Sequence, residues 1–143
     1  MIRDARPPDR EALEPLWAEC LRLHGAAHDP RAFACVFAMA LAGQGFGLRV
    51  AAPGEALLGF ALHAWAPNSW TGLTDGTLDT LFVAEAARGQ GLSRALLDDL
   101  LALARARGWR TVIWHVAKDN APARALYDRY AQPDGYLRYR VAP

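Results

Sequence analysis

The feature that most constrains the fold is a strand-to-helix junction in the second half of the chain. Residues 78–83 have the apolar and β-branched content of a buried strand. Residues 92–107 form the clearest helix, because leucines at helical spacing share one side of it. Gly89 and Gly91 lie between the two elements and permit a tight loop. A strand that turns directly into an amphipathic helix predicts a domain in which helices pack on a sheet.

The rest of the chain supplies further strands and helices. Asp29 and Pro30 are an N-cap and a first-turn proline, so a helix is expected from residue 30 to about residue 43. Pro15 interrupts an earlier helical pattern, and that helix either begins at Pro15 or kinks there. The expected strands are residues 2–5, 48–52, 57–65, 78–83, 111–116 and 136–141, and the remaining helices cover residues 120–130 and the segment after Pro8. The order β, α, α, β, β, β, α, β, α, β predicts one mixed sheet with helices on both faces.

Length and composition restrict the function classes. With 143 residues and 52% hydrophobic content, the chain is expected to form a single domain over residues 1–143. The formal net charge of +1 gives no broad basic surface, which disfavours nucleic acid as a partner. Because no secretory h-region or apolar run of about 18 residues is present, we expect a soluble cytoplasmic protein with no membrane partner. Cys20 and Cys35 lie in apolar helical patterns and are expected to pack in the core rather than form a bridge.

The glycine loop has the chemistry of an anion site. Its amide N–H groups can point inward, and the positive end of the following helix faces the same space. Backbone donors of this kind bind a pyrophosphate without a metal, and Arg88 adds a cation at the rim. A dinucleotide-binding loop would have a third glycine, and a Walker loop would continue with Gly-Lys-Ser/Thr; the sequence has neither. The glycine pair taken alone fits an anion site and a plain turn equally well.

Two motifs together resemble the GCN5-related N-acetyltransferase (GNAT) family. The segment Arg88-Gly89-Gln90-Gly91-Leu92-Ser93 matches the family's cofactor loop, Arg/Gln-x-x-Gly-x-Gly/Ala, except that Ser93 replaces the final small residue. The segment Asn120-Ala121-Pro122-Ala123-Arg124-Ala125-Leu126-Tyr127 resembles the family's Asn-x-x-Ala-x-x-x-Tyr helix. The resemblance implies the acyl-CoA N-acyltransferase fold, an α/β (α+β) fold with a mixed, mainly antiparallel sheet between helices. It also implies acetyl-CoA as cosubstrate and no metal.

The resemblance assigns roles to individual residues. Tyr127 stands seven residues after Asn120, as in the family helix, and would protonate the departing CoA thiolate, although its spacing also suits a core aromatic. Asp79 would take the proton of the attacking amine, or it would only attract the substrate cation. Asn120 is an N-cap, a contact to the pantetheine arm, or both. The expected cofactor-binding residues are Leu81, Phe82 and Val83, through their main chain, and Arg88, Gly89, Gln90, Gly91, Leu92, Ser93 and Asn120.

The acceptor is expected to be a small primary amine, such as a polyamine or an amino acid. Residues 78–83 are similar to the Leu-Glu-Asp-Leu-Phe-Val strand of the diamine acetyltransferase-like branch, and residues 68–72 are similar to its Ser-Thr-Trp-x-Gly loop. His63, Trp65 and Trp70 would line the amine pocket or simply pack in the fold. The alternatives are an inactive CoA-binding sensor module and a protein lysine or N-terminal acetyltransferase. A homodimer is implied by the resemblance alone.

Overall fold

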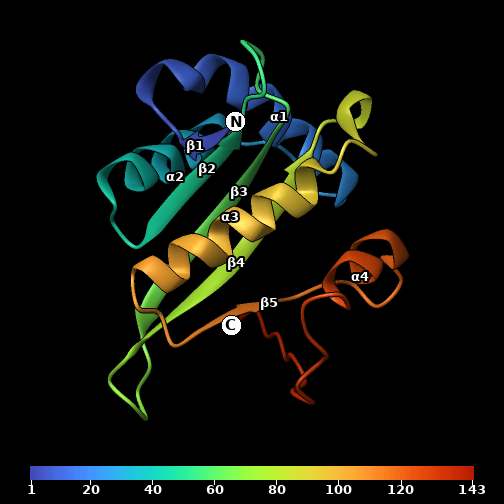
Figure 1. Ribbon diagram of the computed structural model, residues 1–143. Helices are drawn as coiled ribbons and strands as arrows, with labels where there is room; N and C mark the ends of the chain where they lie inside the picture. Colours follow the sequence, from blue (N-terminus) through green and yellow to red (C-terminus); the bar gives the residue numbers. More distant parts are fainter.

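The computed structural model describes all residues from 1 to 143 and shows a sheet with helices packed on it (Figure 1). The strands are β1 (Ile2–Asp4), β2 (Phe46–Ala51), β3 (Gly59–Pro67), β4 (Thr74–Val83) and β5 (Thr111–Trp114). The α-helices are α1 (Arg10–Leu23), α2 (Pro30–Ala42), α3 (Leu92–Ala106) and α4 (Ala121–Tyr127), and the short 3-10 helices are η1 (Pro7–Asp9) and η2 (Glu85–Ala87). None of the helices has both the length and the apolar character needed to span a membrane.

The five strands form one sheet in the order β1-β2-β3-β4-β5. Neighbouring strands are antiparallel except for β4 and β5, which are parallel. The expectation of a mixed, mainly antiparallel sheet is therefore confirmed. β4 pairs with β3 over its whole length but with β5 only over residues 75–78. The last part of β4 consequently has no strand beside it on the β5 side.

Alternating side chains of the sheet build two cores, one on each face. In β2, Leu48 and Val50 pack with α1 and α2, whereas Ala51 packs with α3. In β3, Phe60 belongs to the first core and Ala61 to the second. Helices therefore cover both faces, as the order of elements predicted.

Local sequence signals set most helix ends. The Asp29 side chain accepts a hydrogen bond from the Arg31 N–H at 2.8 Å, and Gly43 ends α2 with φ 64°, so the expected bounds of this helix are confirmed. α1 begins at Arg10 and continues through Pro15, so a start at the proline is wrong. Cys35 is exposed, which also corrects its expected place in the core.

The strand expected over residues 136–141 is absent. This segment pairs with no strand, and Tyr136 and Tyr139 are 81% and 88% exposed. Alternating aromatic and apolar residues favour an extended chain, but a strand also needs a neighbouring backbone with which to hydrogen-bond. The prediction failed because the segment makes no such pairing, even though β5 lies at the edge of the sheet.

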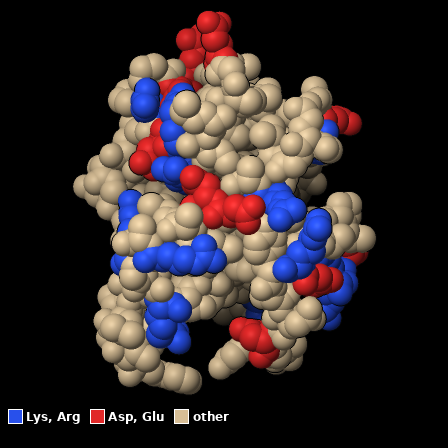
Figure 2. Space-filling model, in the orientation of Figure 1, with Lys and Arg blue, Asp and Glu red and all other residues tan.

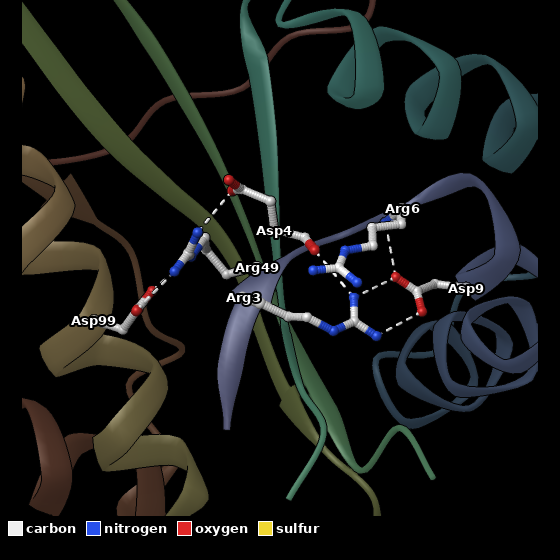
Figure 3. Close-up of polar contacts among 6 residues, drawn as sticks. All are labelled: Arg3, Asp4, Arg6, Asp9, Arg49 and Asp99. Carbon is white, nitrogen blue, oxygen red and sulfur yellow. Dashed lines mark hydrogen bonds and ion pairs between the residues drawn. The ribbon is translucent and has the colours of Figure 1, made fainter. Parts of the chain in front are cut away.

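An arginine joins the first strands to the central helix (Figure 3). The Arg49 guanidinium of β2 donates two hydrogen bonds to the Asp99 carboxylate of α3, at 2.6 and 2.8 Å, and a third to Asp4 of β1 at 2.7 Å. The pKa of Arg49 is raised, and the hydrogen bonds to Asp99 are the largest cause. Arg3 of β1 makes a similar two-bond pair with Asp9 of η1. The first set of bonds ties α3 to β1 and β2, and the second ties η1, which leads into α1, to β1.

A buried histidine makes the fold sensitive to acid. His63 in β3 is 1% exposed, neither ring nitrogen has a hydrogen-bond partner, and its ring lies 5.9 Å from that of Trp65 and 5.8 Å from that of Trp109. Burial, with help from the nearby Arg107 cation, lowers its pKa from 6.5 to about 4. As the pH falls, His63 therefore becomes protonated at a higher pH in the unfolded chain than in the folded chain. The free energy of unfolding should decrease as the pH drops from 6.5 towards 4.

We expect His63→Phe to remove part of this acid sensitivity. Between pH 7 and pH 4.5, the wild-type protein should lose about 2 kcal/mol more of its unfolding free energy than the variant does. Urea unfolding followed by tryptophan fluorescence at the two pH values measures this difference. Equal losses in the two proteins would show that His63 does not sense the acid.

Candidate active site

A groove of about 2630 Å³ lies where the sheet opens between β4 and β5. The register pairs Leu62 with Thr80 and His63 with Leu78, so Asp79 is the extra residue of a β-bulge in β4. Pairing of β4 with β5 ends one residue earlier, at Leu78 and Trp114. Because a bulge bends its strand, the bulge at Asp79 explains why the two strands separate there.

The free edge of β4 borders this opening. Leu81, Phe82 and Val83 all line the groove, and the side chains of Phe82 and Val83 are only 6% exposed. Since these side chains are buried in the cores, the strand meets the groove mainly with its backbone. An extended ligand could therefore hydrogen-bond to β4 in the place of a neighbouring strand.

The glycine loop and the start of α3 form a row of free amide donors. Gly89 and Gly91 have φ values of 77° and 78°, which only glycine adopts readily, and a Cβ at either position would meet open space. The backbone N–H groups of residues 89–94 have no acceptor in the chain, and no side chain caps α3. Free donors at a positive helix end suit a diphosphate, so the observed loop fits the pyrophosphate of a CoA molecule.

The other loop residues differ in their place. Arg88 is held beside the end of β4, because its Nε donates a hydrogen bond to the Val83 carbonyl oxygen at 3.4 Å. Leu92 and Ser93 line the groove together with Arg88, Gly89 and Gly91, whereas Gln90 does not. Charges of both signs are mixed over the face of the molecule in Figure 2, so a local site rather than a broad field would attract an anion.

Tyr127 is the one tyrosine that combines partial burial with a free hydroxyl. It lines the groove, its ring lies 5.6 Å from that of Trp114, and its hydroxyl makes no hydrogen bond within the chain. Burial raises its pKa, so it stays a phenol at neutral pH. Tyr130 instead donates a hydrogen bond to Asp98 at 2.7 Å, and Tyr136 and Tyr139 lie on the exposed C-terminal segment.

Asp79 and His115 stand on the two sides of the opening. Each follows the last paired residue of its strand, and both line the groove. Burial raises the pKa of Asp79, and the positive charge of a protonated His115 opposes part of that rise. Sequence reasoning missed His115, because no local pattern in residues 111–116 shows that this strand lies parallel to β4 and that their pairing stops at Trp114.

The remaining expected residues divide between the groove and the core. The Asn120 side chain accepts a hydrogen bond from the Ala123 N–H at 3.2 Å, which confirms the N-cap, and Asn120 also lines the groove. Trp70 lines the groove and is 89% exposed. His63 and Trp65 lie in a separate hollow of about 320 Å³, so they pack in the fold rather than line this site.

The family is decided by a match that covers most of the chain. Residues 10–131 match the family model described as Acetyltransferase (GNAT) family. The chain belongs to the GNAT family of acetyltransferases. The expectation of a GNAT enzyme is thus met at the level of the family, which uses acetyl-CoA as its acetyl donor. This match does not distinguish the diamine acetyltransferase-like branch from the other branches of the family.

Individual relatives and structural neighbours of this GNAT chain carry different acetyltransferase names. Mycothiol acetyltransferase of Beutenbergia cavernae is 47% identical over 53 residues, which are 37% of this chain and 18% of that protein. The chain therefore spans less than a fifth of that relative's length. Ribosomal-protein-alanine N-acetyltransferase of Brucella melitensis superposes with a TM-score of 0.82 at 24% identity over 99% of both chains. AAC(6')-Iy, in complex with the bisubstrate analogue CoA-S-monomethyl-acetylneamine, superposes with a TM-score of 0.85 at 16% identity, covering 100% of this chain and 98% of that one. These two similarities show a shared fold.

Proposed function

We propose that residues 1–143 form one N-acetyltransferase domain that moves the acetyl group of acetyl-CoA to a primary amine of a small molecule. The observation that carries this proposal is that the free amide donors of residues 89–94 and the free hydroxyl of Tyr127 border one groove. The amide N–H groups can bind the diphosphate of acetyl-CoA, and the hydroxyl can protonate the sulfur of CoA as it leaves.

The cofactor would lie along the opening between β4 and β5. Its diphosphate would accept hydrogen bonds from the loop of Gly89 and Gly91, with Arg88 at the rim. Its pantetheine arm would pair with the backbone of residues 81–83, which has no strand partner on that side. The side-chain oxygen of Asn120 caps α4, which leaves its side-chain NH2 free to bind the same arm.

The acceptor amine would enter on the side of Asp79. An alkylammonium group is almost fully protonated at pH 7 and must lose a proton before it can attack a thioester. The Asp79 carboxylate attracts this cation to the opening between β4 and β5. Asp79 and Trp70 both line the groove and both belong to the segments that resemble the diamine acetyltransferase-like branch, which favours a polyamine among the small amines.

Two alternatives define the test. The protein acetyltransferase in the Brucella comparison has the same fold, and the large groove leaves room for a peptide N-terminus. A CoA-binding sensor would keep the loop but would have no need of the unpaired Tyr127 hydroxyl.

We expect calorimetry to show acetyl-CoA binding and thiol release to occur with small primary amines. The assay compares polyamines, amino acids, aminoglycosides and an alanine-terminated peptide at equal concentration. Turnover of the peptide alone would replace the small-amine assignment with a protein acceptor. Binding without thiol release on any acceptor would favour the sensor, and absence of acetyl-CoA binding would contradict the enzyme assignment altogether.

A further inference from the structure

The geometry points to His115 as the side chain that accepts the proton of the acceptor amine, with Asp79 as the neighbouring carboxylate whose charge stabilises the imidazolium. This inference rests on the proposed transfer of acetyl to an amine. It adds to the site a residue that neither sequence motif contains.

The positions of the two residues follow from the ends of two parallel strands. Leu78 and Trp114 are the last pair between β4 and β5, so Asp79 and His115 are the next residue on each strand. Carboxyl ends of neighbouring parallel strands lie at the same edge of a sheet and bring their side chains to one place. The bulge leaves Asp79 without a partner on β3, and both side chains line the groove. The opening of the sheet thus presents an imidazole and a carboxylate together.

Imidazole is better suited to this proton transfer than a carboxylate alone. A free alkylammonium titrates near pH 10.4, an ordinary imidazolium near 6.5 and an ordinary carboxylic acid near 4. The proton is therefore transferred to an imidazole less unfavourably than to a carboxylate, and bases that titrate near the working pH are the most effective. A negative charge near the imidazole stabilises the imidazolium that forms. The strand register places Asp79 next to His115, because each follows the last pair of the β4–β5 ladder.

The titratable groups of α1 and α4 that line the groove are less suitable. Burial raises the pKa of the Cys20 thiol to about 11, so this group is neutral. The Nδ1 atom of His24 lies 2.8 Å from the Cys20 carbonyl oxygen, so that ring is held to its own helix. Burial raises the pKa of Tyr127, so its hydroxyl is protonated when the ammonium binds and cannot take the first proton.

The charged groups on the strands and on the β5–α4 segment are also otherwise engaged. Asp75 pairs with Arg110 at 2.6 Å, at the opposite end of the β4–β5 ladder from the opening. Lys118 and Asp119 follow His115 in the chain and carry opposite charges, so their effects on the imidazole oppose each other. Arg124 donates a hydrogen bond to the Lys118 carbonyl oxygen at 2.8 Å.

The proton and electron balance of the step is complete. The ammonium gives one proton to the His115 imidazole, which later releases it to solvent. The nitrogen lone pair then forms a bond to the acetyl carbonyl carbon, and the carbon–sulfur bond breaks with its electron pair on sulfur. Tyr127 gives its phenolic proton to that sulfur and regains a proton from the nitrogen, which keeps its third hydrogen as the amide N–H. The net change converts an ammonium ion and a thioester into an amide, a thiol and one proton.

The test compares His115→Gln, Asp79→Asn and the double variant in the full chain, with kcat/KM for the best amine measured from pH 6 to pH 10. We expect His115→Gln to lose about 100-fold at pH 7. Its activity should recover about tenfold per pH unit as the fraction of free amine rises, a recovery that a merely structural role would not produce. The double variant should lose less than the product of the two single losses, because the Asp79 charge helps this step by stabilising the His115 imidazolium.

The acetyl-CoA dissociation constant of each variant shows whether the site is intact, and we expect it to change less than about twofold. His28→Gln is the matched control: this imidazole bonds to Glu14 outside the groove, so the variant should keep the wild-type pH profile. A His115→Gln enzyme with wild-type activity and pH profile would overturn the inference while leaving the proposed transfer in place. Failure of the unaltered protein to acetylate any amine would overturn both.

Discussion

The Tyr127→Phe variant is expected to turn over about 10² to 10³ times more slowly than the wild-type protein while binding acetyl-CoA within about twofold of its affinity. The variant keeps the ring that packs on Trp114 and loses only a hydroxyl that makes no bond within the chain. The fold should therefore be undisturbed. The lost oxygen matters only when the departing sulfur needs a proton, so the effect should fall on kcat rather than on binding.

Tyr130→Phe is the matched control for this change. It removes a hydroxyl from a neighbouring tyrosine whose bond goes to Asp98, so it should cost about 1 kcal/mol of unfolding free energy and leave kcat nearly unchanged. Single-turnover thiol release and acetyl-CoA calorimetry on both variants separate the two effects. Equal slowing in both variants, or a Tyr127→Phe enzyme of normal kcat, would remove Tyr127 from the proposed chemistry.

The parts of the site that depend on local sequence could be predicted. Two glycines followed at once by an amphipathic helix predict a tight loop at the start of α3, and both glycines do have positive φ. The Asn120 cap fixes the start of α4 and so the place of Tyr127 on that helix. Such features need no knowledge of distant contacts, because backbone conformation and helix periodicity determine them.

The parts of the site that depend on pairing between strands could not be predicted from the sequence. The β-bulge at Asp79 arises from the register between β3 and β4, and no local pattern in residues 78–83 marks the extra residue. His115 becomes a neighbour of Asp79 only because β5 lies parallel to β4 and its pairing stops at Trp114. The error over residues 136–141 has the same origin, since alternation describes one chain and a strand requires two.

The proposed diphosphate site at the free amide groups of residues 89–94 can be tested with a substitution that stabilises α3 and weakens diphosphate binding. Ser93 lies in the first turn of α3, next to donors that have no acceptor. A carboxylate in that turn interacts favourably with the helix dipole, so Ser93→Glu should raise the unfolding free energy by about 0.5 kcal/mol. The same charge about 5 Å from a diphosphate costs roughly 3 kcal/mol at an effective dielectric constant near 20. We therefore expect acetyl-CoA affinity to fall about 100-fold.

Ser93→Gln separates charge from size in this experiment. Glutamine occupies nearly the same volume without the charge, so it should weaken acetyl-CoA binding far less than glutamate does and should not stabilise α3 through the dipole. Calorimetry at low and high salt adds a second measurement, because added salt should reduce the loss caused by glutamate and leave that caused by glutamine unchanged. Equal losses for the two variants would mean that space and not charge limits this position. A more stable Ser93→Glu protein with undiminished affinity would mean that the diphosphate binds elsewhere, since a helix start that gains from a carboxylate cannot hold a diphosphate beside it without repulsion.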